Sequence, residues 1–103
     1  MIKNDKRSKS DILYEMILTL KDMDECKKFF TDLCTVAELR AMEQRFEVAL
    51  LLSDGMIYND ILERTGASSA TISRVNRSLN YGAEGYQTVL PRAKEYWEQH
   101  GKL

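Results

Sequence analysis

The chain has 103 residues, of which 44% are hydrophobic and 30% are charged, and its net charge is −1 at pH 7. This composition is that of a soluble globular protein and excludes disordered and collagen-like chains, while a single proline among five glycines favours helices over short strands. The length fits one domain with a modest core, near the size at which a second copy often supplies missing burial.

The N-terminus and the longest apolar run indicate the cellular compartment of the protein. Residues 1–9 are polar, of mixed charge and without periodicity, and we interpret them as a flexible basic arm before a single helical domain over residues 10–103. The longest apolar run, Val48 to Leu52, is far shorter than the roughly 20 residues of a membrane span. Because the N-terminus also lacks the apolar stretch of a signal peptide, we expect no membrane association and a cytoplasmic protein.

Apolar side chains at helical spacing predict two amphipathic helices after the arm. The first is capped by Ser10 or Asp11 and ends near Met23, and the second is short. Cys26 and Cys34 fall in or beside the apolar pattern, and a cytoplasmic compartment disfavours disulfides. We therefore expect two buried free thiols.

A long third helix is predicted over Val36–Ser53. Thr35 and Glu38 have the spacing of a capping box at its start, and Asp54-Gly55 ends it. Its apolar residues lie on more than one side, so the helix must be covered from more than one side. We favour a partner chain as the cover, and the alternative is that the C-terminal helix alone supplies it.

Residues 57–80 have the spacing of a helix-turn-helix. Gly66 lies where the turn needs a residue tolerant of positive φ, and Ser68 or Ser69 caps the second helix. The predicted inner faces are apolar and consist of Ile57, Ile61 and Leu62 in the first helix and of Ile72, Val75 and Leu79 in the second.

The outer face of that second helix carries small polar residues and arginines. Small hydroxyl side chains near a helix N-terminus let the backbone approach base edges, and arginines bind phosphate or guanine through paired donors. The alternative is a solvated helix pair, in which lysine and glutamate are the expected fillers. Neither occurs between Ala67 and Asn80, so the pattern favours DNA binding.

The C-terminal part completes an all-α fold of about six helices. Asn80-Tyr81-Gly82 is predicted to end the preceding helix, with Gly82 available for a left-handed conformation, and Pro91 suits the first turn of a last helix. His100 is the only histidine, and no nucleophile and base stand at a recognisable spacing. We therefore expect neither an enzyme nor a metal site.

Two segments resemble one known family. "GASSATISRVNRSL" (residues 66–79) resembles the recognition segment of the Trp repressor family, and "TVAELRAMEQRFEVALLL" (residues 35–52) resembles the helix before its helix-turn-helix. The match runs in the same order over about residues 11–99 and is closest to members without an assigned effector. The resemblance implies an intertwined homodimer whose two DNA-reading heads meet a near-palindromic operator, with half-sites about one helical turn apart.

The resemblance also implies an effector pocket formed by Thr35, Arg45, Arg74 and Val75. In the members that bind tryptophan, two arginines and a threonine hold the amino acid, and Arg45, Arg74 and Thr35 fall at these positions. Val75 stands where those members have glycine, and a β-branched side chain would obstruct the indole, which argues against tryptophan. The alternative for Arg45 is an ion pair with helix acids such as Glu38.

We therefore predict a sequence-specific DNA-binding transcriptional regulator, a repressor that acts as a homodimer on double-stranded DNA. Whether a small-molecule effector controls it stays open, and no other cofactor is expected. The residues predicted to approach bases or phosphates are Asn59, Arg64, Ser68, Ser69, Ala70, Thr71, Arg74 and Arg77. The alternative function is a helical dimeric protein-interaction module that does not bind DNA.

Overall fold

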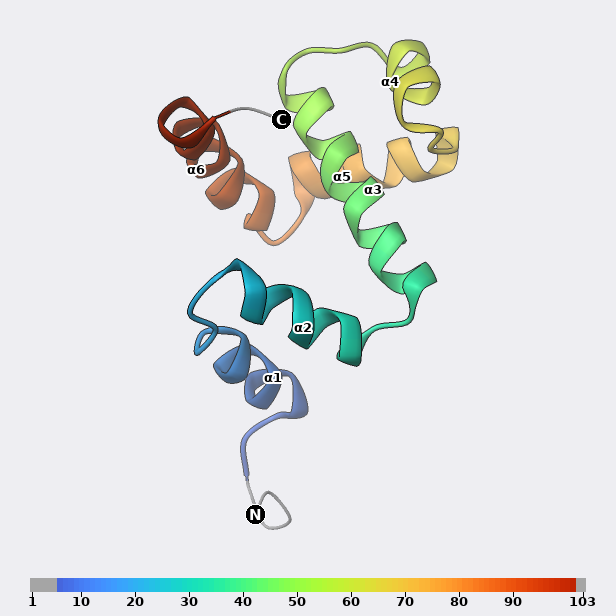
Figure 1. The fold of residues 1–103 in the computed structure, drawn as a ribbon. Helices are drawn as coiled ribbons and strands as arrows, with labels where there is room; N and C mark the ends of the chain where they lie inside the picture. Colours follow the sequence, from blue (N-terminus) through green and yellow to red (C-terminus); the bar gives the residue numbers. More distant parts are fainter. Residues whose placement is uncertain (1–5, 102–103) are drawn as a thin grey trace. The chain divides into compact units, whose positions relative to one another are not determined.

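The computed structural model describes residues 6–101, which form six α-helices and no strand (Figure 1). The helices are α1 (Lys9–Ile17), α2 (Met23–Leu33), α3 (Val36–Ser53), α4 (Tyr58–Thr65), α5 (Ser69–Tyr81) and α6 (Gly85–His100). The predicted all-α fold class is confirmed. Among residues 6–101, none of the helices combines the length and the apolar character that a bilayer crossing requires.

Contacts within the chain divide it into two compact units, which we call unit 1 (residues 1–39) and unit 2 (residues 40–103). The first turn of α3 belongs to unit 1 and the rest of that helix to unit 2. The prediction of a single helical domain over residues 10–103 stays a prediction.

The first helix starts earlier than expected, because Ser8 is its N-cap. The hydroxyl oxygen of Ser8 accepts a hydrogen bond from the backbone N–H of Asp11 at 3.0 Å. Neither Ser10 nor Asp11 caps the helix, so that prediction is wrong, and Lys9 is already helical. Of the predicted arm, residues 1–5 lie outside the described residues.

The break between α1 and α2 also differs from the prediction, since α1 ends at Ile17 and Met23 begins α2. Asp22 has an extended backbone, and its carboxylate accepts a hydrogen bond from the N–H of Glu25 at 2.9 Å. The Glu25 carboxylate accepts one in return from the N–H of Lys21 at 3.0 Å. This reciprocal capping starts a new helix where apolar spacing alone predicts continuation.

The predicted capping box at the start of α3 is confirmed. The hydroxyl oxygen of Thr35 accepts from the N–H of Glu38 at 3.1 Å, and the Glu38 carboxylate accepts from the N–H of Thr35 at 2.8 Å. The backbone N–H and the hydroxyl of Thr35 both lower the pKa of Glu38 from its ordinary value. The charged carboxylate is therefore the form that this cap favours.

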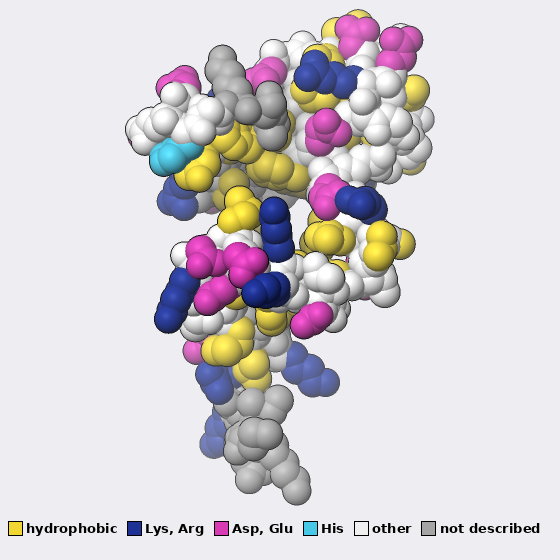
Figure 2. Space-filling model, viewed as in Figure 1, with side chains coloured by type: hydrophobic (Ala, Val, Ile, Leu, Met, Phe, Trp, Pro, Cys, Tyr) yellow, Lys and Arg dark blue, Asp and Glu magenta, His cyan; other side chains and the backbone are white. Residues whose placement is uncertain are grey.

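Unit 1 has no core of its own in the single chain. In its described residues, 6–39, no side chain is buried. Apolar side chains instead lie at its surface among the charged ones (Figure 2). The large exposed ones are Tyr14, Met16, Leu18, Met23, Leu33 and Val36, and Leu18 is 85% exposed.

The two cysteines of unit 1 are free thiols, as predicted. Both Cys26 and Cys34 are nevertheless partly exposed rather than buried. The difference follows from the missing core of unit 1, because a thiol on an apolar face is buried only when another surface covers that face.

All buried apolar residues of the described chain lie in unit 2. They come from four helices and the turn between α4 and α5, and they are Val48, Ala49, Leu50, Ile61, Ala67, Ile72, Val75 and Leu90. Three of them are consecutive in α3 and therefore span about 200° of its circumference. The prediction that α3 is covered from more than one side is thus confirmed within unit 2.

The connection from α5 to α6 uses Gly82 in a different way from the prediction. Its φ is −85°, so it is not left-handed, and the residue with positive φ is Glu84, at 70°. A Cβ atom on Gly82 would collide with the backbone carbonyl oxygen of Ser78. Glycine is needed here for a close approach of backbone to backbone.

Pro91 lies inside α6 and not in its first turn, because α6 begins at Gly85. The helix extends this far towards its N-terminus because Tyr86 packs against the core one turn before the buried Leu90. Proline has no N–H to donate to the carbonyl of Gln87, which is exposed, so water can satisfy that group. Packing outweighs the proline signal in this helix.

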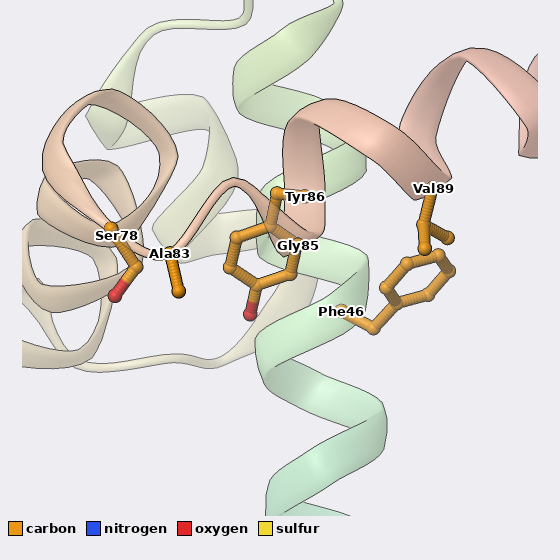
Figure 3. A pocket seen from close by; sticks show the side chains of 7 residues that line it. Phe46, Ser78, Ala83, Gly85, Tyr86 and Val89 are labelled. Carbon is orange, nitrogen blue, oxygen red and sulfur yellow. The ribbon is translucent and has the colours of Figure 1, made fainter.

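An apolar hollow of about 480 Å³ lies in unit 2 between α3, the end of α5 and the start of α6. Figure 3 shows Phe46 on α3 pointing toward Val89 on α6, with Tyr86 and Ala83 further along the same side. Val89 is 44% exposed. Unit 2 therefore leaves part of its own apolar surface uncovered.

We predict that Gly82→Ala lowers the free energy of unfolding by about 1 to 3 kcal/mol, because the new methyl group must displace the backbone of the last turn of α5. Gly85→Ala is the matched control. Its Cβ meets nothing within 4 Å, and the change should raise stability by about 0.4 to 1 kcal/mol. Urea unfolding at one protein concentration measures both. Equal effects of the two changes would contradict the close approach at Gly82.

Candidate nucleic-acid interface

α4 and α5 pack against each other across a short turn, which is the geometry of a helix-turn-helix. Gly66 ends α4 in the left-handed conformation, with φ 72° and ψ 5°, as predicted. Its N–H donates to the carbonyl of Leu62 at 2.9 Å. A residue with a Cβ would be strained at this φ, so glycine sets the direction in which α5 leaves the turn.

Thr65 ties the turn together and connects it to α3. Its hydroxyl donates to the carbonyl of Ile61 at 2.7 Å and accepts from the N–H of Ala67 at 3.1 Å. Its carbonyl accepts from the side-chain amide of Gln44 at 3.3 Å. The Gln44 bond joins residues 21 apart in the sequence, so no local pattern predicts it.

Ser68 is the N-cap of α5, which decides between the two serines left open by the sequence. Its hydroxyl oxygen accepts from the N–H of Thr71 at 3.1 Å, and its hydroxyl donates to the Thr71 hydroxyl oxygen at 3.0 Å. Both hydroxyls thus hold the first turn of α5. Ser69, the next residue, is exposed.

The inner faces of α4 and α5 contain most, but not all, of the predicted residues. Ile57 and Leu62 do not belong to the inner face, since they are 63% and 42% exposed. Ile57 is the N-cap of α4 and has an extended backbone, so its side chain does not follow the helical face. The residues that do face inward are Ile61, Ile72 and Val75, with Leu79 packed against them.

The predicted contact residues of α5 lie at the surface, apart from Thr71, which is partly buried. With Ile72 and Val75 facing inward, the helical period places Ala70, Arg74 and Arg77 on the outward side. The N–H groups of Ser69 and Ala70 have no intrahelical acceptor, so they can bind an anion together with the positive end of the helix dipole.

The charged side chains of α5 are all positive. No Asp or Glu occurs between Arg64 and Ala83, while Arg64, Arg74 and Arg77 are all exposed. Within residues 6–101, none of these three arginines forms an ion pair. Their guanidinium groups are therefore available to an anionic partner, although the whole chain carries a net charge of −1.

The first helix of the pair contributes both signs of charge. Asn59 and Arg64 are exposed on α4, as are the acids Asp60 and Glu63. The acids of the helix-turn-helix are thus confined to α4. In the part of the predicted arm that the structure describes, Arg7 is bonded to the Glu15 carboxylate at 2.6 Å and is not a free cation.

The residues implied for an effector pocket occupy different environments. Thr35 lies in unit 1, and its hydroxyl belongs to the cap of α3. In unit 2, Arg45 is partly buried, Arg74 is exposed and Val75 is only 2% exposed, inside the core. Among the described residues, Arg45 forms no ion pair with an acid of α3 such as Glu38.

Comparison with known proteins assigns this fold. The family model described as Trp repressor protein matches residues 8–94. The chain belongs to the Trp repressor family. It is 53% identical over 85 residues to an uncharacterized protein of Bacillus subtilis (strain 168), YerC, with 82% of each chain covered.

Two solved structures are similar to this Trp repressor family member. A TrpR-like protein from Eubacterium eligens ATCC 27750 is 52% identical, with a TM-score of 0.79 over 87% of this chain and 94% of that one. A Staphylococcus aureus protein assigned provisionally as a Trp repressor is 42% identical, with a TM-score of 0.81 over 91% and 94%. The resemblance drawn from the sequence is thereby confirmed.

We predict that Ser68→Ala lowers the free energy of unfolding by about 1 kcal/mol, because the first turn of α5 loses its cap. Ser69→Ala is the matched control, since the same hydroxyl is removed from the next, exposed position, and it should change stability by less than about 0.5 kcal/mol. Urea unfolding of both variants tests the difference. A larger loss of stability in Ser69→Ala than in Ser68→Ala would show that Ser69, and not Ser68, caps α5.

Proposed function

We propose that this protein is a sequence-specific DNA-binding transcriptional regulator, a repressor that acts as a homodimer on a near-palindromic operator. The observation that carries the proposal is the outer face of α5, which is exposed, free of acids and supplied with unpaired arginines. A helix of this kind, presented by a closed turn, fits the major groove and its phosphate rims. Membership of the Trp repressor family supports the same function.

In this proposal the predicted residues divide by role. Ser69 and Ala70 meet base edges, and Ser68 and Thr71 hold the helix end that brings them there. Arg74 reaches a base or a phosphate. Asn59 on α4 likewise reaches a base or a phosphate. The contacts that fix the protein on the DNA backbone come from Arg64, Arg77 and the basic arm.

Homodimerisation rests on apolar surface that the single chain leaves exposed. Unit 1 buries no side chain in its described residues, and unit 2 keeps an apolar hollow at Phe46 and Val89. Exposure of large apolar side chains costs about 1.5 to 3 kcal/mol each relative to burial. A second copy offers the same surfaces in return, as a two-fold symmetric interface requires.

A small-molecule effector, where one acts, is proposed to differ from tryptophan. Val75 lies in the core of unit 2 at 2% exposure, so its side chain occupies space at the position that is glycine in tryptophan binders. Arg74 is exposed and Arg45 is partly exposed, so both side chains can contact a ligand. Such a ligand would act by binding one orientation of the reading head better than another.

We predict that Arg77→Ala weakens binding to every duplex by about tenfold and lowers the salt slope of binding by about one unit, both for each subunit, because each subunit loses a phosphate contact. Fluorescence anisotropy against genomic and random duplexes at several salt concentrations measures both quantities. Arg92→Ala, the same loss of charge at an exposed position of α6, is the control and should leave the slope nearly unchanged.

Two outcomes would contradict the DNA-binding proposal. If the unchanged protein binds no duplex at low ionic strength, the function is wrong and the interaction module is favoured instead. If Arg77→Ala and Arg92→Ala weaken binding equally and flatten the slope equally, attraction is general and α5 has no special role.

We predict that the full chain sediments at twice its 11.9 kDa mass at micromolar concentration. The physical reason is the uncovered apolar surface of both units. Analytical ultracentrifugation over a dilution series measures the mass and the dissociation constant. A species of 11.9 kDa at every concentration would overturn the homodimer.

A further inference from the structure

Tyr81, the last residue of α5, is an exposed aromatic side chain that the contacts above do not use. It is 87% exposed, more than any other large apolar or aromatic residue described in the chain. Within residues 6–101 its hydroxyl has no hydrogen-bond partner. An aromatic ring held in water with a free phenol gains little from folding, so its placement points to a partner outside the chain.

The helical period puts Tyr81 on the side of α5 that carries the arginines. It follows Arg77 by four residues and Arg74 by seven, and both spacings return to the same face of a helix. All three side chains are exposed, whereas Ile72 and Val75 point into the core. Tyr81 therefore continues the outward row of α5 to its C-terminal end.

The length of the helix decides what Tyr81 would meet. From Ala70 to Tyr81 the helix rises by about 16 Å, at about 1.5 Å per residue. The major groove is only about 12 Å wide, so a helix whose first turn touches base edges has its far end at the rim of the groove. The groups exposed at that rim are phosphates, for which a tyrosine hydroxyl is an ordinary donor.

We propose that the Tyr81 hydroxyl donates a hydrogen bond to a DNA backbone phosphate at the edge of the groove in which α5 binds. The inference rests on the proposed function and adds a contact at the end of α5 opposite its N-terminal base contacts. The nearest acid along the chain is Glu84, in the connection to α6, and no acid lies on the row itself. A neutral donor here adds affinity without adding charge.

The test uses the full chain, its Tyr81→Phe variant and a labelled pool of random duplexes of about 30 base pairs, long enough for two half-sites one turn apart. Tyr81→Phe should weaken binding of the proposed dimer by about a hundredfold, since each subunit loses a hydrogen bond to a charged acceptor and each loss weakens binding by about tenfold. The salt slope should stay unchanged, because a neutral phenol releases no counterion. Tyr96→Phe makes the same change on α6, where the side chain is 53% exposed, and should bind as the unchanged protein does.

Three outcomes would overturn the inference, and each differs from a failure of the proposed function, in which the unchanged protein binds no duplex. Equal affinity of Tyr81→Phe and the unchanged protein would show that the Tyr81 hydroxyl makes no contact with the DNA. A loss of affinity in Tyr81→Ala but not in Tyr81→Phe would show that the ring, and not the hydroxyl, contacts the DNA. A higher dissociation constant of the dimer in Tyr81→Phe, measured by sedimentation without DNA, places Tyr81 between subunits.

Discussion

Burial of Ile61, Ile72 and Val75 in one core fixes α5 on α4, and the rest of the proposed interface depends on it. These side chains are 0 to 2% exposed, so turning α5 about its axis would bring apolar surface into water. Gly66 and Ser68 close the turn at either side, one through its backbone and the other through its hydroxyl. The outward row of arginines is thus a consequence of inward packing.

Unit 2 folds around a core, whereas unit 1 lacks one in the single chain. Unit 2 holds every buried apolar residue of the described chain and carries the helix-turn-helix. Unit 1 consists of capped amphipathic helices without a buried side chain. In the proposed homodimer, a unit 1 that is stable only with a second copy would couple dimerisation to the spacing of the two helix-turn-helix units.

Local patterns in the sequence predicted the features that local physics controls. The Thr35 and Glu38 cap, the ends of α3, the positive φ of Gly66 and the inner positions Ile72 and Val75 all follow from spacing and residue type. The break before α2 could also have been predicted, because Asp22 and Glu25 have the spacing of a helix cap. The apolar periodicity, which continues to Met23, was given more weight than this capping signal.

Other features depend on contacts between distant residues and could not be predicted this way. Pro91 is inside α6 because Leu90 and Tyr86 pack on the core, and Gly82 is required by the carbonyl of Ser78 and not by its own φ. The Gln44 bond to Thr65 belongs to the same class. Which of two adjacent serines caps α5 was left open by the sequence, and the answer changes the proposed role of Ser68 from contact to support.

The central claim is that α5 enters the groove through its first turn, and backbone amide mapping tests it most directly. A ¹⁵N-labelled sample is titrated with a duplex, and the amide resonances of the protein are followed by two-dimensional NMR. The account predicts that the largest changes fall on Ser69, Ala70 and the arginine-bearing turns of α5, with small changes in the middle of α6. Changes confined to α6 or to unit 1, with α5 unaffected, would contradict it.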